Sequence, residues 1–372
     1  MPKPTSHRRE FLKGQALHKS LADQIKSHQN SHSYKQQAES SDTASYLVQI
    51  TRKAMACEFQ IFLNAGEHDH ATEASVEALD LVEEVEDILS IYRHHTSASQ
   101  LNQLGSSQAV QVHPILLKIL KQAKQLWQQT EGAFDITSTA LSKLWGFHQK
   151  KHRVPSQKEI QQTLRHISSE HLIINDDESV QFGCPKLQID LGSIGKGYAL
   201  DRCHQHFVAD NLTNYLLHGG LSSVFARGRR LNESSQALGW QIGLRHPLVP
   251  EQYLAHLWLS NIAAGTSGDA NQFFYHQGQR YGHVLDPRTG HPVKNVLSAT
   301  AFCPTAAEAD ALATAFYVMG PDKTAEYCQQ YGTGFLIVEQ GKLNRATRLH
   351  TAGLSENQIE LIDPSAELIF YE

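Results

Sequence analysis

The sequence predicts an α+β fold, in which helices and strands occur together without the regular strand–helix alternation of a parallel sheet. Three observations support this class. Two long stretches have the apolar spacing of amphipathic helices, strand-like segments gather between residues 180 and 300, and an apolar helix that begins with small residues follows them near residue 306. No proline- or glycine-rich linker divides the chain after residue 45, so we expect residues 46–372 to form one folded unit.

The elements are expected where apolar residues recur every second position, as in strands, or every third to fourth position, as in helices. The expected strands lie at residues 46–50, 58–63, 171–174 and 335–338. The expected helices lie at residues 71–91, 113–128, 156–165 and 306–319. In the first helix Ala78, Val85 and Ile88 would face inward, whereas Glu83 and Asp87 belong to an acidic face that we interpret as solvated.

The first 45 residues differ in composition from the rest of the chain. Residues 18–45 are rich in polar residues and poor in bulky apolar ones, so this stretch is expected to be disordered. Residues 8–13, Arg-Arg-Glu-Phe-Leu-Lys, resemble the twin-arginine export motif. Because the following residues are polar, we interpret this motif as degenerate, which favours a cytoplasmic location. A functional signal, and with it a periplasmic or membrane-associated location, stays open as the alternative.

Composition argues against several classes of protein. The chain has 33 Lys and Arg residues against 38 Asp and Glu residues, and this net charge of −5 argues against a dedicated nucleic-acid binder. No apolar run approaches the roughly 18–20 residues that a membrane-spanning helix needs, so no stable membrane insertion is expected. The five cysteines form no CxxC pair, and we interpret them as small buried apolar residues, typical of a reducing compartment.

The first segment that could carry chemistry is residues 188–199, Gln-Ile-Asp-Leu-Gly-Ser-Ile-Gly-Lys-Gly-Tyr-Ala. It is expected to begin as a strand and to continue into a helix. Such a junction presents free backbone N–H groups to an anion, and Lys196 adds a positive charge for a phosphate. The segment is neither a Walker A loop nor a dinucleotide fingerprint. By pattern alone, a tight turn between packed elements explains it equally well.

Two further segments contain polar residues on short, rigid elements. His283 precedes the turn Asp-Pro-Arg-Thr-Gly at residues 286–290, at the end of an expected short strand, where it could act as a general base or be a structural histidine. Asp310 and Thr314 share one face of a small-residue helix and could hold a hard cation such as Mg²⁺. Alternatively, Asp310 caps the helix or bonds locally. Together the three segments indicate phosphoryl chemistry on a nucleotide.

The segments in this order resemble the ApbE family, the FAD:protein FMN transferases. The resemblance covers residues 46–345. It depends on several short strings that occur in the family's order, and one string alone would be weak. The matching strings are Lys53–Cys57, Ser90–Arg93, Ser99–Asn102, Thr130–Thr137, Leu144–Phe147, Asp190–Asp201, His218–Gly220, Thr266–Asp269, His283–Gly290 and Asp310–Thr314. The resemblance implies an ApbE-like mixed fold with antiparallel sheets and packed helices.

The resemblance also implies an activity and a set of site residues. Members transfer the FMN half of FAD to a Thr or Ser hydroxyl of an acceptor flavoprotein subunit, release AMP and use Mg²⁺. The cation would be held by the Asp310 carboxylate, the Thr314 hydroxyl and the Ser193 carbonyl, and His283 would take the proton of the incoming hydroxyl. The positions expected to line the flavin and its pyrophosphate are Met55, Tyr92, Ala133, Phe134, Asp135, Asp190, Lys196 and Val284.

Two alternatives and several departures accompany this assignment. The same pocket could hydrolyse FAD to FMN and AMP, because the nucleophile comes from outside, or it could bind flavin as a carrier without turnover.

The family usually has Met-Gly-Thr where this chain has Met55-Ala56-Cys57. Ala270-Asn271-Gln272 stands where an aromatic residue is expected, and the basic stretch at residues 227–230 could contact adenosine phosphates, the acceptor or only water.

Overall fold

The computed structural model describes residues 46–148, 151–231, 238–270, 272–341 and 347–371. The expectations for residues 1–45 lie outside these described residues. Among the described residues, no helix combines the length and the apolar character that crossing a bilayer would require. Helices and mainly antiparallel sheets occur together, so the expected α+β class is confirmed.

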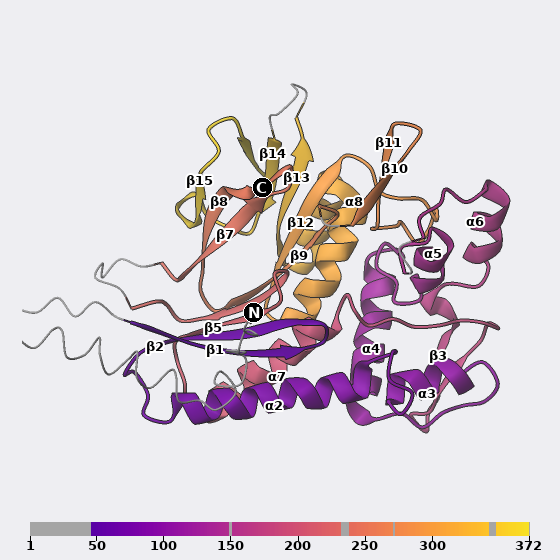
Figure 1. The fold of residues 1–372 in the computed structure, drawn as a ribbon, viewed down its shortest axis with the longest axis horizontal. Helices are drawn as coiled ribbons and strands as arrows, with labels where there is room; N and C mark the ends of the chain where they lie inside the picture. The colour runs from indigo at the N-terminus through magenta and orange to yellow at the C-terminus, as the bar shows by residue number, and fades with distance from the viewer. Residues whose placement is uncertain (1–45, 149–150, 232–237, 271, 342–346, 372) are drawn as a thin grey trace, which may run out of the picture. The chain divides into compact units, whose positions relative to one another are not determined.

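The central element is a nine-stranded sheet in the order β1-β2-β5-β6-β9-β12-β13-β14-β16 (Figure 1). Every neighbouring pair in it is antiparallel except β14 and β16, which are parallel. The strands are β1 (Leu47–Ala54), β2 (Cys57–Asn64), β5 (Tyr215–Gly219), β6 (Ser223–Arg227), β9 (Ile262–Gly268), β12 (Val296–Cys303), β13 (Gly334–Gln340), β14 (Thr347–Ala352) and β16 (Glu367–Phe370).

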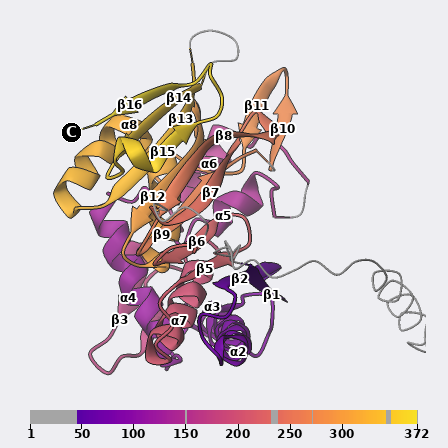
Figure 2. The same cartoon turned by 90° about the vertical axis from the view of Figure 1, so that its left-hand side faces the viewer.

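Three smaller sheets accompany the central one. A three-stranded sheet packs against one face of the central sheet, and a hairpin projects beside it (Figure 2). The three-stranded sheet consists of β7 (Trp240–His246), β8 (Val249–Leu259) and β15 (Ile359–Leu361). The hairpin consists of β10 (Phe273–His276) and β11 (Gln279–Gly282). The third small sheet is a short pair of strands, β3 (Leu172–Ile174) and β4 (Val180–Phe182).

The helices cover the other face of the central sheet and extend to one side of it (Figure 1). The helix α8 packs on β9, β12 and β13, α7 packs on β5 and β6, and α2 packs on α7. The helices are α2 (Ala71–Leu89), α3 (Ser97–Leu104), α4 (Pro114–Gln129), α5 (Thr139–Leu144), α6 (Gln157–Leu164), α7 (Gly195–Ala209) and α8 (Ala306–Tyr331), with short 3₁₀ turns at Ser169–His171 and Glu356–Gln358.

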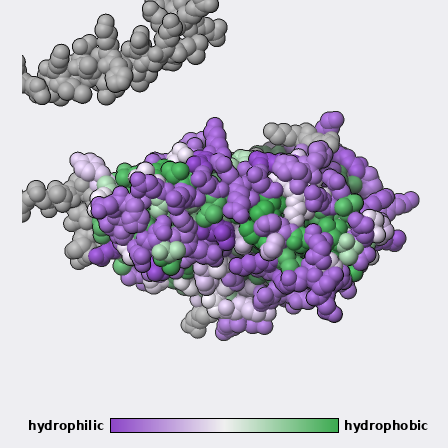
Figure 3. All heavy atoms as spheres, turned by 90° about the horizontal axis from the view of Figure 1, so that it is seen from below, coloured by the Kyte–Doolittle hydropathy of each residue, from purple (hydrophilic) through white to green (hydrophobic). Residues whose placement is uncertain are grey.

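Most expected elements are confirmed, with ends that shift by a few residues. The helices expected at 71–91, 113–128 and 156–165 are α2, α4 and α6, and the four expected strands are β1, β2, β3 and β13. The acidic side chains of Glu83, Glu84 and Asp87 on α2 are exposed, as predicted. The side of the molecule seen from below is mostly hydrophilic (Figure 3).

Three differences have local physical causes. The strand expected from Gln188 is wrong: Ile189 exchanges two hydrogen bonds, of 2.8 and 2.9 Å, with the Asn102 side chain instead of pairing with a strand. The expected helix at 306–319 breaks at Gly320 (φ 75°) and then continues in α8, because Pro321 fits the first turn of a new helix. The short helices α3 and α5 were not expected, since neither has a long apolar repeat.

The five cysteines are all free, as expected, and four of them are buried. The fifth, Cys57, is partly exposed and follows the turn between β1 and β2. In that turn Met55 and Ala56 have φ values of 50° and 59°, the left-handed pair of a two-residue hairpin turn, which glycine, asparagine and aspartate prefer. An alanine in this conformation has unfavourable contacts between its Cβ and the backbone.

Replacing Ala56 by glycine should therefore stabilise the protein. We expect A56G to raise the free energy of unfolding by about 1 kcal/mol in urea denaturation, because glycine adopts positive φ without strain. Ala109→Gly, at an exposed non-helical position with ordinary φ, is the matched control and should lower stability slightly. An unchanged or lower stability of A56G would contradict strain at this turn.

Candidate active site

A cavity of about 400 Å³ lies where α7, α8, β9 and the loop after β11 meet. Nine of the twelve site residues proposed from the sequence line it: Ala133, Phe134, Asp135, Ser193, Lys196, His283, Val284, Asp310 and Thr314. The other three, Met55, Tyr92 and Asp190, line an adjoining pocket of about 170 Å³. The two pockets share Gly192 and Lys196. The structure thus brings all twelve residues, from segments up to 259 positions apart, around two adjoining pockets.

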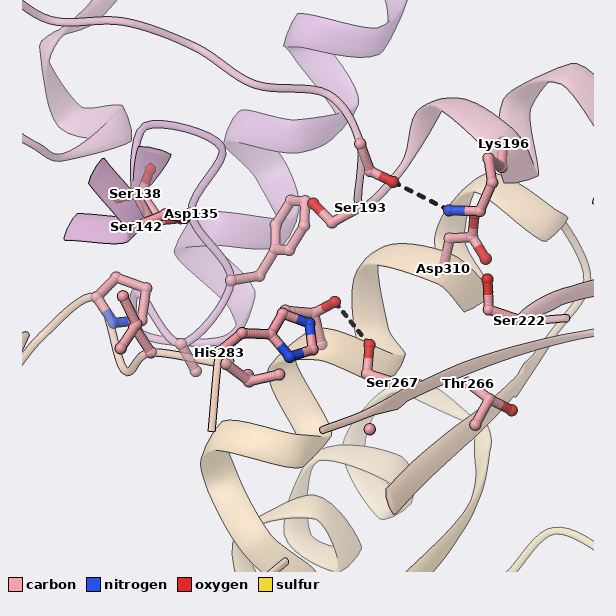
Figure 4. A pocket seen from close by; sticks show the side chains of 18 residues that line it. Asp135, Ser138, Ser142, Ser193, Lys196, Ser222, Thr266, Ser267, His283 and Asp310 are labelled. Carbon is pink, nitrogen blue, oxygen red and sulfur yellow. Dashed lines mark hydrogen bonds between the residues drawn. The ribbon is translucent and has the colours of Figure 1, made fainter. Parts of the chain in front are cut away.

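The arrangement of the labelled side chains divides the main cavity into parts (Figure 4). Lys196 and Asp310 lie close together on one side, with Ser193 and Ser222 near them. Asp135, Ser138 and Ser142 lie on the opposite side, and His283 stands between the two groups. The group around Asp310 and Lys196 and the candidate base His283 therefore line one cavity.

Asp310 is the most buried charged group of this site, with 6% of its surface exposed. Its Oδ2 accepts a 2.7 Å hydrogen bond from the backbone N–H of Gly197, and its Oδ1 accepts a 2.6 Å bond from the hydroxyl of Ser223. Burial raises the pKa of this carboxyl group, and the charge of Lys196 and the two hydrogen bonds oppose the rise. Each carboxylate oxygen keeps a lone pair that is not used by these two donors.

The groups around Asp310 carry oxygen atoms that could coordinate a cation. The Thr314 hydroxyl lies one helical turn beyond Asp310 on α8 and is 2.9 Å from the Ser267 hydroxyl of β9. Ser193, in the turn that precedes α7, lines the same cavity. A carboxylate, hydroxyls and a backbone carbonyl are hard ligands, which suit Mg²⁺ rather than zinc or copper. The donor set therefore fits the cation that the sequence analysis expects.

Two close approaches of the backbone hold α8 against its neighbours. A Cβ atom at Gly197 would lie 2.0 Å from the carbonyl oxygen of Ala306, and one at Gly265 would lie 2.3 Å from that of Ala309. No side chain larger than hydrogen fits at either position without moving backbone. These two glycines allow α7 and β9 to approach the turn of α8 that carries Asp310.

His283 directly follows β11, as the sequence analysis expects. Its Nδ1 lies 3.2 Å from the carbonyl oxygen of Gln272, which favours the tautomer with the proton on Nδ1 and leaves Nε2 as the acceptor. Burial lowers the pKa of His283, so the ring is neutral at pH 7. The hairpin before it is held by the 2.6 Å ion pair between Arg280 and the buried Asp269.

Not every predicted residue offers its polar group to the cavity. The Asp135 carboxylate accepts four hydrogen bonds from the backbone and hydroxyls of Thr137 and Ser169, at 2.7–3.0 Å. Its role in the structure is to tie the loop after α4 to the 3₁₀ turn at Ser169. Phe134 is 1% exposed and belongs to the core, whereas Tyr92 is 72% exposed and does not.

Several residues that build the site were given no role from the sequence, although Ser267 and Asp201 lie in two of the matching strings. Ser223 donates to Asp310, and the Ser267 hydroxyl lies 2.9 Å from that of Thr314, but a single serine in a strand has no distinguishing signal. Asp201, seven residues into α7, accepts the N–H groups of Ala306 and Ala307. The basic stretch at residues 227–230 does not line either pocket.

Comparison with known proteins gives consistent matches. The model of the ApbE family matches residues 53–337. The FAD:protein FMN transferase of Vibrio cholerae is 33% identical over 65% of this chain and 72% of its own length, and that of Escherichia coli is 29% identical over 68% and 73%. Among solved structures, the flavin transferase ApbE from V. cholerae (TM-score 0.71, 28% identity) covers 83% of this chain and 98% of its own. The ApbE protein of Thermotoga maritima (TM-score 0.69, 28% identity) covers 79% and 94%.

Removing the Ser223 hydroxyl should destabilise the folded protein. S223A leaves one oxygen of a buried carboxylate without its donor, so we expect a loss of about 2 kcal/mol in urea denaturation at pH 7. Ser222→Ala, at the neighbouring and more exposed serine, is the control and should change stability by less than about 0.5 kcal/mol. Equal effects of the two variants would mean that the Ser223–Asp310 bond is not important for folding.

Proposed function

The chain belongs to the ApbE family, and we propose that it transfers the FMN half of FAD to a Thr or Ser hydroxyl of an acceptor flavoprotein and releases AMP. Relatives that align with two thirds or more of this chain are FAD:protein FMN transferases. The observation that carries the proposal is the convergence of Ser193, Lys196, Asp310 and Thr314 on one cavity beside a second, less polar pocket.

The oxygen donors of Ser193, Asp310 and Thr314 are the proposed Mg²⁺ ligands. This assignment is supported by their common cavity and by the burial of Asp310, whose negative charge lacks a direct ion pair among the described residues. When bound there, Mg²⁺ would neutralise charge on the phosphate oxygens. Lys196 would add a second positive charge, and its Nζ now donates to the Gly192 carbonyl at 3.1 Å.

The start of α7 would bind the pyrophosphate. Its first residues are Gly195, Lys196 and Gly197, and its N-cap residue, Ile194, offers no side-chain acceptor to the first-turn N–H groups. A helix N-terminus with free N–H groups favours an anion. The N–H groups of Gly195 and Gly197 already bond to the Leu191 carbonyl and to Asp310, so the anion would use the N–H group of Lys196 between them.

The adjoining pocket is the proposed site of the flavin ring. Its lining includes the apolar side chains of Met55, Leu89 and Ile91 and the exposed ring of Tyr92. An apolar slot with an accessible aromatic face suits a planar heterocycle. Gly192 and Lys196 line both pockets, so the ribityl phosphate would cross from one to the other there.

His283 is the proposed general base. In the transfer, the oxygen of the acceptor hydroxyl forms a bond to the phosphorus of the FMN half, the bond from that phosphorus to the bridging oxygen breaks, and AMP departs with the electron pair. The hydroxyl proton passes to Nε2 of His283, which the Nδ1–Gln272 contact leaves free. Burial of the ring supports this role, because it keeps the imidazole neutral.

The decisive experiment supplies the chain with FAD, Mg²⁺ and an acceptor flavoprotein subunit. We expect AMP release and flavin fluorescence that stays with the acceptor on a denaturing gel. Asp310→Asn, which keeps the side-chain shape, should lower the rate by about a thousandfold or more, because the cation then loses its only charged ligand. Glu326→Ala, an exposed acidic residue of the same helix, is the control and should leave the rate unchanged.

The same experiment separates the alternatives. AMP release without an acceptor would identify a hydrolase that produces FMN and AMP. Flavin binding without AMP release, unaffected by Asp310→Asn, would identify a carrier. No labelling of a competent acceptor would contradict the transferase assignment.

The pH dependence of turnover should report His283. The neutral form is the base, and the pKa is lowered from the ordinary 6.5, so the rate should be constant near pH 7 and fall only at lower pH. His283→Gln should lower the rate by about 10²–10⁴-fold and remove this acidic limb. The measurement is kcat from pH 4.5 to 8 at saturating FAD and Mg²⁺. An identical limb in His283→Gln would assign the titration to another group.

A further inference from the structure

Two buried aspartates exchange hydrogen bonds between α7 and α8. Asp310 of α8 accepts the N–H of Gly197 in the first turn of α7, at 2.7 Å. Asp201 of α7 accepts the N–H groups of Ala306 and Ala307 in the first turn of α8, at 2.6 and 3.0 Å. Each helix thus supplies a carboxylate that binds the N-terminal turn of the other. Both carboxylates are more than nine-tenths buried.

The N-terminus of α8 depends on this partner more than on its own cap. The first N–H groups of a helix have no acceptor within the helix. The local N-cap, Thr305, accepts only the N–H of Glu308, over a long 3.4 Å contact. The N–H groups of Ala306 and Ala307 are bonded by Asp201 instead, from a different helix. The carboxylate that caps the N-terminus of α8 therefore also connects this helix to α7.

The connection lies at a point of close backbone approach between the two helices. A Cβ at Gly197 would lie 2.0 Å from the Ala306 carbonyl oxygen, so the backbones touch there with no side chain between them. The proposed cation ligands lie on both sides of this contact. Ser193 precedes α7, whereas Asp310 and Thr314 follow Ala306 by one and two turns on α8. A small shift of one helix along the other would separate the carbonyl from the carboxylate.

We propose that Asp201 is a positioning residue, which holds α7 and α8 in register so that Ser193, Asp310 and Thr314 can bind one divalent cation. The inference rests on the proposed function, because it concerns the same cation site. It extends the site to a residue that neither pocket includes. The negative charge of Asp201 is needed less than its two acceptor oxygens, which an asparagine cannot both supply.

The test compares Asp201→Asn with Thr305→Ala in the full chain. Both variants remove an acceptor from the N-terminus of α8, but only Asp201 also binds that turn to α7. Binding of Mg²⁺, and of Mn²⁺ as a spectroscopic probe, is measured by titration without FAD. We expect Asp201→Asn to weaken cation binding about 10–100-fold and Thr305→Ala to change it less than about twofold. Excess Mg²⁺ should restore part of kcat in Asp201→Asn.

A second measurement does not require a stable variant. In the wild-type chain, hydrogen exchange at the Ala306 and Ala307 amides should be as slow as in the middle of α8, although first-turn amides usually exchange quickly. Fast exchange there would overturn the proposal. Wild-type cation affinity in a folded Asp201→Asn, or an equal loss in Thr305→Ala, would also overturn it.

These results are distinguishable from a failure of the proposed function. A wild-type chain that binds the cation but labels no acceptor contradicts the transferase alone, and the comparison of Asp201→Asn with Thr305→Ala still stands. A wild-type chain that binds neither Mg²⁺ nor Mn²⁺ contradicts the cation site and Asp201's role together.

Discussion

The carboxylate of Asp310 lies on the inward face of a helix whose other inward residues are mostly alanine, leucine and phenylalanine. A buried carboxylate is costly unless donors or a cation compensate it. Here Ser223 and the N–H of Gly197 supply two donors, and Lys196 supplies a nearby charge. Much of the surrounding structure follows from this need. The strand β6 must begin at the cavity with Ser223, α7 must begin there, and glycine must stand where the backbones meet.

The same compensation would let the proposed cation site keep its geometry when no cation is bound. The two donors hold Asp310 in place, but they leave lone pairs on both oxygens directed elsewhere. Close packing on α7 and β9 prevents α8 from turning Asp310 towards bulk water. Binding energy is then not spent on ordering the ligands, which is the advantage of a preorganised site.

The sequence alone could predict the fold class, most of the elements and a set of residues that line the two pockets, because each depends on local patterns or on short strings in a fixed order. Strong apolar repeats locate α2 and α4, and β-alternation locates β2. It could not predict the path of residues 188–191, because Asn102 replaces a strand partner there. The roles of Ser223 and Asp201 could not be predicted either, although Asp201 closes a matching string, because these roles depend on the carboxylate and main-chain groups that folding brings to them.

The departure from the family pattern at Met55-Ala56-Cys57 affects both a backbone turn and the chemistry beside the pockets. Ala56 keeps the left-handed turn in spite of its Cβ, so Met55 still lines the proposed flavin pocket. Cys57 lines neither of the two pockets, but a thiolate beside them could compete with the acceptor hydroxyl. Burial raises the pKa of Cys57, and this effect outweighs the opposing charge of Lys196. The thiol therefore stays protonated at neutral pH, and the substitution introduces no competing nucleophile beside the proposed transfer site.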